Sequence, residues 1–204
     1  MNAGADRVAT RGQWVSLRPV RKDDYPAFFA WRTAPDVYIL NFPKYVASHE
    51  DFESELTKLV RSSVALVVED NQLRIPIGFT MGYQLNQWDG WMFVGAYVEP
   101  EFRRRGHGGE ASSLAMDFMF RLLPLRMVYA EIYDFSTDAL GICQAMGFEE
   151  VGYQPEHYWR GDQFWGLHRL MLTRERWAAH RERFFDILDV QEDMRESDLS
   201  RLAQ

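Results

Sequence analysis

Apolar residues along the first third of the chain recur at two different periods. Residues 14–20, WVSLRPV, alternate between apolar and polar positions as a half-buried strand does. Residues 23–32, DDYPAFFAWR, open with acids and an early proline and then show helical spacing. Ser48 precedes the polar run H-E-D, which predicts an N-capped helix that continues to about Arg61. Residues 34–46 contain two prolines and fit neither period, so we expect an aromatic loop there.

The middle of the chain changes to strand periodicity. Three extended segments, residues 63–70, 74–86 and 90–98, are separated by Asp-Asn and Trp-Asp-Gly turns. The last of them is apolar on both faces, which indicates a central strand. A helix is predicted over 108–123, and its inward face carries Ala111, Leu114, Ala115, Phe118 and Leu122.

The second half of the chain alternates strands and helices, and this pattern predicts a crossover. Residues 126–134 form a strand-like run, and residues 136–146 form a helix that Gly147 closes. A succession of strand, helix and strand within one sheet makes a right-handed crossover between parallel neighbours. The sequence therefore predicts an α+β protein with a mixed, partly parallel sheet.

The end of the chain predicts a strand pair and one further helix. Residues 148–154 and 164–172 have the pattern of closing strands, joined by a polar and aromatic loop over 154–162. An amphipathic helix over about 174–190 precedes a charged end, and we expect it to pack on the domain or on a second copy of the chain, as in a homodimer. With 204 residues, the chain has room for one domain and an appendage. We expect a loose tail over 1–12, one domain over 13–173, and a C-terminal helix and tail over 174–204.

The charge and the cysteine content exclude several classes of protein. The formal net charge of −7 and the pI of about 5.3 argue against a nucleic-acid-binding protein. The single cysteine, Cys143, rules out an internal disulfide and is typical of a reducing compartment. Neither a signal-peptide core nor a run of membrane-spanning length is present. We expect a cytoplasmic protein that binds no membrane.

One stretch carries recognisable chemistry: VEPEFRRRGHGGEA, residues 98–111, between a central strand and a helix. The N-terminus of a helix presents unsatisfied N–H groups, and glycines let the backbone approach a ligand closely. Neighbouring arginines add charge-assisted hydrogen bonds, so the stretch predicts a phosphate cradle. No Gly-Lys-Ser/Thr follows, which excludes a P-loop, and the glycine order differs from the dinucleotide fingerprint. The acid Glu110 falls in the first helical turn, where it complements the helix dipole. The competing interpretation is a solvated basic turn that only caps the helix.

Three stretches together resemble the GNAT superfamily of N-acetyltransferases, in its RimJ/RimL-type branch. Val98-x-Pro100 followed by Arg103-x-x-Gly106-x-Gly108 is similar to the family's coenzyme A pyrophosphate motif. The start SLRPVRKDDYPAFFAWR resembles that branch's opening strand and helix, and AEIYDFSTDALGICQAMGFEEVG resembles its late strand, helix and glycine turn. The resemblance covers roughly residues 14–173. It implies a central sheet of six or seven strands flanked by helices.

The resemblance also implies a cosubstrate and the residues that hold it. Acetyl-CoA would lie between two splayed central strands, with its pyrophosphate on backbone N–H groups across Arg104–Gly109 and its pantetheine on the strand ending at Val98. A backbone N–H near Ala96 would polarise the thioester carbonyl. No metal ion is implied, and the side chain of His107 is expected to face solvent or phosphate. The implied cofactor-binding residues are Ala96, Tyr97, Val98, Arg103, Arg104, Arg105, Gly106, His107, Gly108, Gly109 and Ser136.

The chain departs from the branch at two positions near the cosubstrate. Where relatives often have Asn followed three residues on by Ser, this chain has Ser136 and Ala139. Ser136 could still cap its helix and bond the cofactor arm, whereas Ala139 could not. Where many members carry the Tyr that protonates the leaving thiolate, the spacing from Gly147 gives Cys143. Cys143 is either that acid or a small buried apolar residue, and we favour the packing role.

The sequence leaves open which residue accepts the proton and which residues bind the amine that receives the acetyl group. Glu131, Asp89 and His157 are candidate bases, each with a structural role as the alternative, and relay through water would also serve. We favour Glu131, flanked by tyrosines on one strand face. The aromatic loops favour a small-molecule amine over a protein N-terminus as the acceptor, and a non-catalytic acyl-CoA-binding module is the third possibility. The expected acceptor-site residues are Trp31, Tyr38, Phe42, Trp91 and His157.

Overall fold

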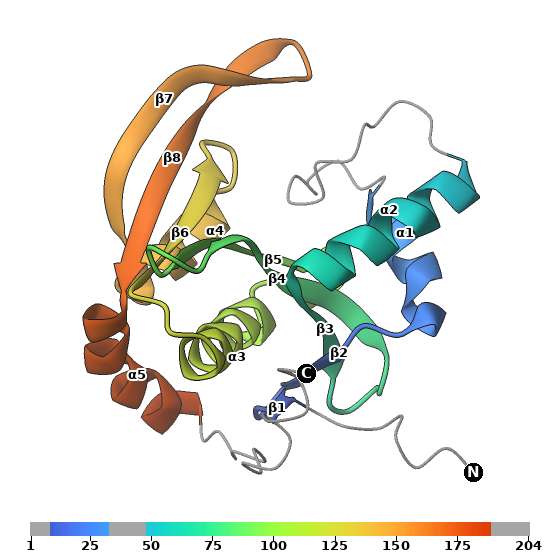
Figure 1. Ribbon diagram of the computed structural model, residues 1–204, viewed down its shortest axis with the longest axis horizontal. Helices are drawn as coiled ribbons and strands as arrows, with labels where there is room; N and C mark the ends of the chain where they lie inside the picture. The colour runs from blue at the N-terminus through green and yellow to red at the C-terminus, as the bar shows by residue number, and fades with distance from the viewer. Residues whose placement is uncertain (1–8, 33–47, 189–204) are drawn as a thin grey trace.

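The computed structural model describes residues 9–32 and 48–188 (Figure 1). Across these residues one sheet of eight strands runs in the order β1-β2-β3-β4-β5-β6-β8-β7. The strands are β1 (Thr10–Arg11), β2 (Val15–Pro19), β3 (Val64–Asp70), β4 (Pro76–Asn86), β5 (Trp91–Val98), β6 (Met127–Tyr133), β7 (Glu149–Arg160) and β8 (Gln163–Thr173). The helices are η1 (Lys22–Asp24), α1 (Tyr25–Arg32), α2 (His49–Ser62), η2 (Pro100–Phe102), α3 (His107–Leu122), α4 (Thr137–Ala145) and α5 (Arg174–Leu188). The predicted mixed α+β architecture is confirmed.

The helices cover both faces of the sheet and divide the apolar interior into two cores. On one face α3 packs on the strands, and its Leu114 and Met119 lie with Val94 of β5 in a core that we call the α3-side core. On the other face Phe28 of α1 and Phe52 of α2 form a second core with strand residues that include Phe79. Side chains along a strand alternate between faces, so the central strands must be apolar on both. This double burial explains why residues 90–98 lack the alternation of a surface strand.

The sheet is divided by a fork between β5 and β6. Every other neighbouring pair is antiparallel, whereas β5 and β6 are parallel and joined through α3, as the crossover predicted. They pair only at Trp91–Met127, Met92–Val128 and Phe93–Tyr129. Beyond these registers β5 continues to pair with β4, and β6 continues to pair with β8. The two strands therefore diverge over their C-terminal halves, where a ligand can enter the sheet.

Helix α3 is buried on more sides than its sequence pattern predicts. Met116 and Phe120 lie outside the expected apolar face, yet both are buried. The reason is α5, which packs along α3: Trp177 is only 2% exposed, and Arg181 forms an ion pair with Asp117. The predicted packing of the final helix on the domain is confirmed. No helix in the described part of the chain is long and apolar enough to span a membrane.

Two segments differ from the expected boundaries. Thr10–Arg11 pair with β2, so ordered structure begins inside the segment predicted as a loose tail, and this strand brings the sheet to eight. The expected loop over 154–162 is wrong: β7 and β8 continue through it and meet at a tight turn around Gly161. Their long hairpin projects beyond the rest of the molecule (Figure 1). Its polar and aromatic sequence hid the strand period because β7 is exposed along most of its length and its register shifts between Gln154 and Tyr158.

Candidate active site

The fork exposes backbone groups in the middle of the sheet. Glu99 donates its N–H to Ile77 of β4 at 2.8 Å. Backbone groups of an antiparallel strand alternate between its two neighbours, so those of Ala96 and Val98 are directed toward β6. β6 is not paired there, and Ala96 is exposed although it lies in a central strand. The fork therefore offers donors and acceptors of the kind that a missing neighbouring strand would use.

The turn that precedes α3 leaves an open cradle at the helix N-terminus. Gly106 is the N-cap, with a φ of 88° that only glycine adopts easily, and no side chain caps this end. A Cβ at Gly106 would lie 2.8 Å from the ring of Trp14, so the position also requires close packing. By contrast, a Cβ at Gly109 would meet nothing within 4 Å, and one at Gly108 would meet only Ile142 at 3.7 Å. Uncapped N–H groups beneath open space fit a phosphate.

The three arginines of the motif have different surroundings. Arg103 donates from Nε to the carbonyl of Val98 at 2.8 Å, which fixes the turn on β5. Arg104 is exposed and forms a 3.1 Å ion pair with Asp138 in the first turn of α4. Arg105 is exposed. Thus two of the three cations lie at the surface beside the cradle, while the first is part of its framework.

The expectation for His107 is wrong for its side chain. The imidazole is buried between Trp14 and Phe102, and Nε2 lies 3.3 Å from a carboxylate oxygen of Asp70. Burial opposes ionisation of Asp70, but backbone N–H groups and His107 outweigh it and lower the pKa of Asp70. His107 is the first residue of α3, so its backbone remains at the cradle while its side chain anchors the helix start.

Glu110 has a larger role than dipole complementarity. Its side chain is fully buried and accepts the backbone N–H groups of Gln13, Trp14 and Val15 at 2.5, 2.8 and 2.8 Å. Burial raises the pKa of this carboxyl group, and the three donors partly offset the effect. The contact ties the entry to β2 onto the first turn of α3. A glutamate beside a glycine turn was visible in the sequence, but nothing there indicated a partner about 95 residues away.

The residues of α4 face the cradle from the other side of the fork. Ser136 occupies the predicted N-cap position, but its side chain makes no capping bond. Cys143 packs against the α3-side core, and burial raises the pKa of its thiol to about 12. A thiol with so high a pKa is a poor proton donor near neutral pH, so the surroundings of Cys143 support the packing role.

Glu131 lies two residues beyond the last paired register, at the apex of the fork, on the face that α1 and α2 cover farther along the sheet. It pairs with Arg169 of β8, whose Nη2 is 2.5 Å from Glu131 Oε1. Burial and the charge of Glu131 raise the pKa of Tyr83 to about 12, so the carboxylate acts on a ring of the same surface. The observed contact is the one expected if Glu131 has a structural role, as an ion-paired residue at the sheet surface, rather than the role of base. A half-exposed ion pair is weak enough to exchange partners.

The residues expected in the acceptor site are only partly brought together. Trp31 is 3% exposed, packs against Phe28 and donates its indole N–H to Glu99, so the expectation that it faces a ligand is wrong. Trp91 shares the face of Glu131, but it lies at the paired end of β5 against Tyr129. The residues Tyr38 and Phe42 lie outside the described residues.

Two candidate bases lie away from the fork. His157 is an exposed residue of β7 rather than a loop residue, and it is far along the projecting hairpin. Asp89 bonds Asn86 in the turn between β4 and β5, at the opposite end of β5 from Ala96. Asp89 therefore cannot serve the fork directly, whereas His157 is next to Tyr158, whose ring packs on Tyr133 of β6.

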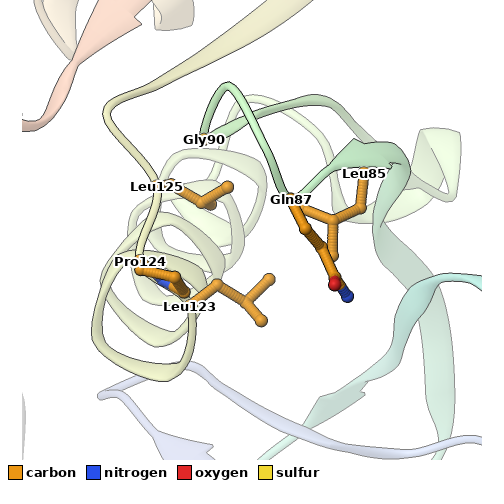
Figure 2. A pocket seen from close by; sticks show the side chains of 6 residues that line it. All are labelled: Leu85, Gln87, Gly90, Leu123, Pro124 and Leu125. Carbon is orange, nitrogen blue, oxygen red and sulfur yellow. The ribbon is translucent and has the colours of Figure 1, made fainter.

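A cavity of about 380 Å³ also lies at that opposite end. Figure 2 shows Leu123 and Leu125, which follow α3, facing Leu85 and Gln87 across this hollow. The 16 residues of α3 separate it from the cradle by about 24 Å. The cavity is therefore no part of the candidate active site.

Comparisons with solved structures agree on the fold. A spermidine N-acetyltransferase from Vibrio cholerae, in complex with CoA and spermine, superimposes with a TM-score of 0.73 over 81% of this chain and 98% of that chain, at 18% identity. A GNAT-family acetyltransferase from Bacillus anthracis gives a TM-score of 0.67 over 81% and 98% of the two chains, at 17% identity. No curated protein matches the sequence.

The sequence itself matches one family model. The model describes an acetyltransferase (GNAT) domain, and it covers residues 15–149, more than half of the chain. This span includes β2, the fork, the cradle and α4, the elements on which the candidate site is built. The protein belongs to the GNAT family of acetyltransferases.

Proposed function

We propose that the protein transfers the acetyl group of acetyl-CoA to a primary amine of a small molecule, by direct attack in a ternary complex. The observation that carries this proposal is the exposed residue Ala96, in the fork of the sheet and beside the uncapped start of α3. Acetyl-CoA is the cosubstrate that the family implies. The match also supports placement in the RimJ/RimL-like branch.

We assign the cosubstrate to the cradle and the fork. The N–H groups from Arg104 to Gly109 would bind the pyrophosphate, with the exposed cations Arg104 and Arg105 beside them. The edge of β5 from Ala96 to Val98 would pair with the pantetheine amides. Because Arg103 already occupies the carbonyl of Val98, the free groups are those nearer Ala96. The open space above Gly108 and Gly109 fits a group that needs close backbone approach.

The reaction requires the protein mainly to position the reactants and to provide a route for one proton. The amine nitrogen must lose a proton before it attacks the acetyl carbonyl, and Glu131 is the carboxylate at the fork that can accept it. The N–H of Ala96 would stabilise the charge that develops on the carbonyl oxygen. As the C–S bond breaks, the thiolate takes a proton from water, because Cys143 has a raised pKa and is assigned to packing. Amine, acyl group and base held together make the attack effectively unimolecular.

A small amine suits the described surface better than a protein N-terminus. The face around Glu131 is lined by the rings of Tyr83, Phe93 and Tyr129, which are half-buried and packed on one another. Such a surface of rings suits apolar contact with a compact acceptor. The Vibrio cholerae neighbour, which holds spermine, shows that this fold can serve small amines, although at 18% identity it supports only the fold here.

One experiment separates this enzyme from a non-catalytic acyl-CoA-binding module. Free thiol release from acetyl-CoA is followed with a panel of small primary amines and with peptides of free N-terminus, while calorimetry measures binding of CoA. The proposal expects CoA binding and amine-dependent thiol release, faster with the small amines than with the peptides. Binding without release in any arm would contradict the enzyme, and release with peptides alone would move the acceptor to a protein N-terminus.

A further inference from the structure

The ion pair between Glu131 and Arg169 places two opposite charges at the apex of the fork. The two residues lie directly opposite each other on β6 and β8. Although β8 is the farther strand from β5, Arg169 reaches back so that its guanidinium lies 5.8 Å from the ring centroid of Phe93. Phe93 belongs to the last register at which β5 and β6 pair. A fixed cation thus lies where the strands begin to diverge, next to the carboxylate proposed as base.

Each partner of this pair keeps one hydrogen-bonding atom that the pair itself does not use. Both bonds of the pair run from Arg169 Nε and Nη2 to Glu131 Oε1. Within the described residues, Arg169 Nη1 and Glu131 Oε2 form no hydrogen bond. The side chains are 43% and 30% exposed, so water and small solutes reach them. The pair can therefore accept one ammonium and one carboxylate at adjacent positions.

Opening the pair for a ligand costs little. Ion pairs between partly exposed side chains contribute little to stability, because desolvation and side-chain entropy offset the attraction. An arginine bound to a carboxylate through two parallel N–H groups is among the stronger charge-assisted contacts. A simple cationic amine gains only the contact to Glu131 and faces repulsion from Arg169. A molecule with both charges satisfies both residues.

We propose that the acceptor is an α-amino acid with an apolar side chain, and that Arg169 is the residue that binds its carboxylate; this inference rests on the proposed function. The α-carbon separates the two charged groups of such a molecule by one atom, which suits side chains from directly paired registers. The rings of Phe93 and Tyr129 lie next to the pair and would pack on an apolar side chain. A carboxylate at the far end of a longer chain would have to fold back to reach Arg169 while the amine lies at the fork, at a cost in conformational entropy.

The group transfer balances without another reactant. The α-ammonium loses one proton to Glu131, and its nitrogen forms a bond to the acetyl carbon. The C–S bond breaks and its electron pair stays on sulfur; the nitrogen gives its second proton to water, and the thiolate takes one proton from water in turn. The products are an N-acetyl amino acid and CoA, with one proton released to solvent from the base. The carboxylate of the acceptor is not consumed, so Arg169 acts only in binding.

The test compares matched acceptors in the full chain. L-phenylalanine, L-leucine and L-methionine are each assayed beside the corresponding α-amide, together with 6-aminohexanoate, by thiol release. The wild type is expected to show a kcat/KM at least tenfold higher for each acid than for its amide, even though the amide has the more easily deprotonated amine. The α-amino acids should also exceed 6-aminohexanoate. Arg169→Gln should lower the acid-to-amide ratio at least tenfold, mainly through KM.

Lys58→Gln is the control variant, because Lys58 forms an exposed ion pair with Glu55 on α2 and its loss should leave the ratio unchanged. Turnover of the amides at the rate of the acids, or an unchanged ratio in Arg169→Gln, would overturn this inference while leaving the acetyltransferase intact. Thiol release with none of these amines, nor with those of the wider panel, would contradict both. If Arg169→Gln misfolds, binding of L-phenylalanine and its amide to the CoA-loaded wild type, measured by calorimetry, decides the same point.

Discussion

The carboxylate of Glu110 on α3 accepts the backbone N–H of Trp14 at 2.8 Å, and Trp14 in turn packs on Gly106 at the start of the same helix. The chain entering β2 is thereby fixed to the turn that forms the cradle. A fully buried acceptor with three N–H donors is costly to alter, because an amide would turn N–H groups toward N–H groups. The contact links stability of the domain to the shape of the cofactor site.

Glu110→Gln should therefore lower the free energy of unfolding by at least about 2 kcal/mol. Urea denaturation followed by circular dichroism measures the change. Glu101→Gln is the matched control, since Glu101 is an exposed acid in the adjacent η2 and should shift stability by no more than about 0.5 kcal/mol. Equal stabilities for both variants would show that the buried contact is unimportant.

The difference in stability between the wild type and Glu110→Gln should depend on pH. Burial raises the pKa of Glu110 in the folded protein above its usual 4.5. Between pH 4.5 and this raised pKa, the folded state therefore binds more protons than the unfolded state. The stability of the wild type relative to Glu110→Gln should fall as pH rises through this interval and level off above it. Urea unfolding at a series of pH values measures the difference, and a relative stability that rises with pH would contradict the raised pKa.

Gly109→Val should weaken acetyl-CoA binding at least tenfold, roughly 1.4 kcal/mol. A Cβ there meets no atom within 4 Å outside the backbone of its own helix, so the variant should fold, and a phosphate close to the backbone would be displaced. Calorimetry measures the affinity. Gly141→Val on α4 is the control, because that glycine also has open space around it and lies outside the cradle. Unchanged affinity in a folded Gly109→Val protein would remove the cradle assignment.

Asp138→Asn should tighten CoA binding severalfold at low ionic strength. Asp138 holds Arg104 in an exposed ion pair, and its charge competes with phosphate for that guanidinium. Arg104→Gln should act in the opposite direction. Both effects should fade as salt screens exposed charges, while stability hardly changes. Affinities at about 0.05 and 0.5 M salt provide the comparison, and a salt-independent loss in Asp138→Asn would mean that Asp138 binds the cofactor itself.

Cys143→Ala should leave turnover nearly unchanged, whereas loss of a proton donor costs about 10²–10⁴-fold. The thiol itself offers an independent measurement. With a pKa of about 12, it should be alkylated by iodoacetamide at least a hundredfold more slowly in the folded protein than in urea at pH 8.5. Fast alkylation of the native protein, together with a large fall in turnover, would make Cys143 the acid.

Glu131→Gln should reduce turnover by about a hundredfold, with partial recovery at higher pH where the amine is already deprotonated. Affinity for acetyl-CoA should stay near normal. Glu149→Gln is the matched control, because Glu149 is also an exposed acid in an arginine ion pair, with Arg176, away from the fork. Wild-type turnover across the pH range in Glu131→Gln would leave relay through water as the route for the proton.

Elements with a strong local signal were predictable from the sequence. Ser48 caps α2 as expected, because its hydroxyl accepts the N–H of Asp51, a contact within one turn. Gly147 adopts a φ of 91° after α4, as a helix-closing glycine does. The turn before α3 was likewise visible, since its glycines and arginines are consecutive. Local chemistry of this kind depends only on near neighbours.

The expectations that were wrong concern residues whose positions depend on tertiary contacts. Trp31, at the end of a predicted helix, was expected in the acceptor site but packs in the second core, because α1 lies on the sheet. His107 was expected to face solvent or phosphate, but its side chain is buried beside Asp70 at the end of β3. No sequence pattern indicated a role for Arg169, because only the pairing of β6 with β8 places it opposite Glu131. Contacts between residues far apart in the chain leave no periodicity to detect.

The three registers that join β5 to β6 have a consequence for how the protein unfolds. The strands on either side of the fork share few backbone hydrogen bonds, so α3 and the α3-side core hold the two groups of strands together. A ligand that bonds to both edges of the fork adds links across this seam that the chain itself does not provide. We therefore expect cosubstrate concentration to govern the cooperativity of unfolding, with the two groups melting more nearly as one unit when the ligand is in excess.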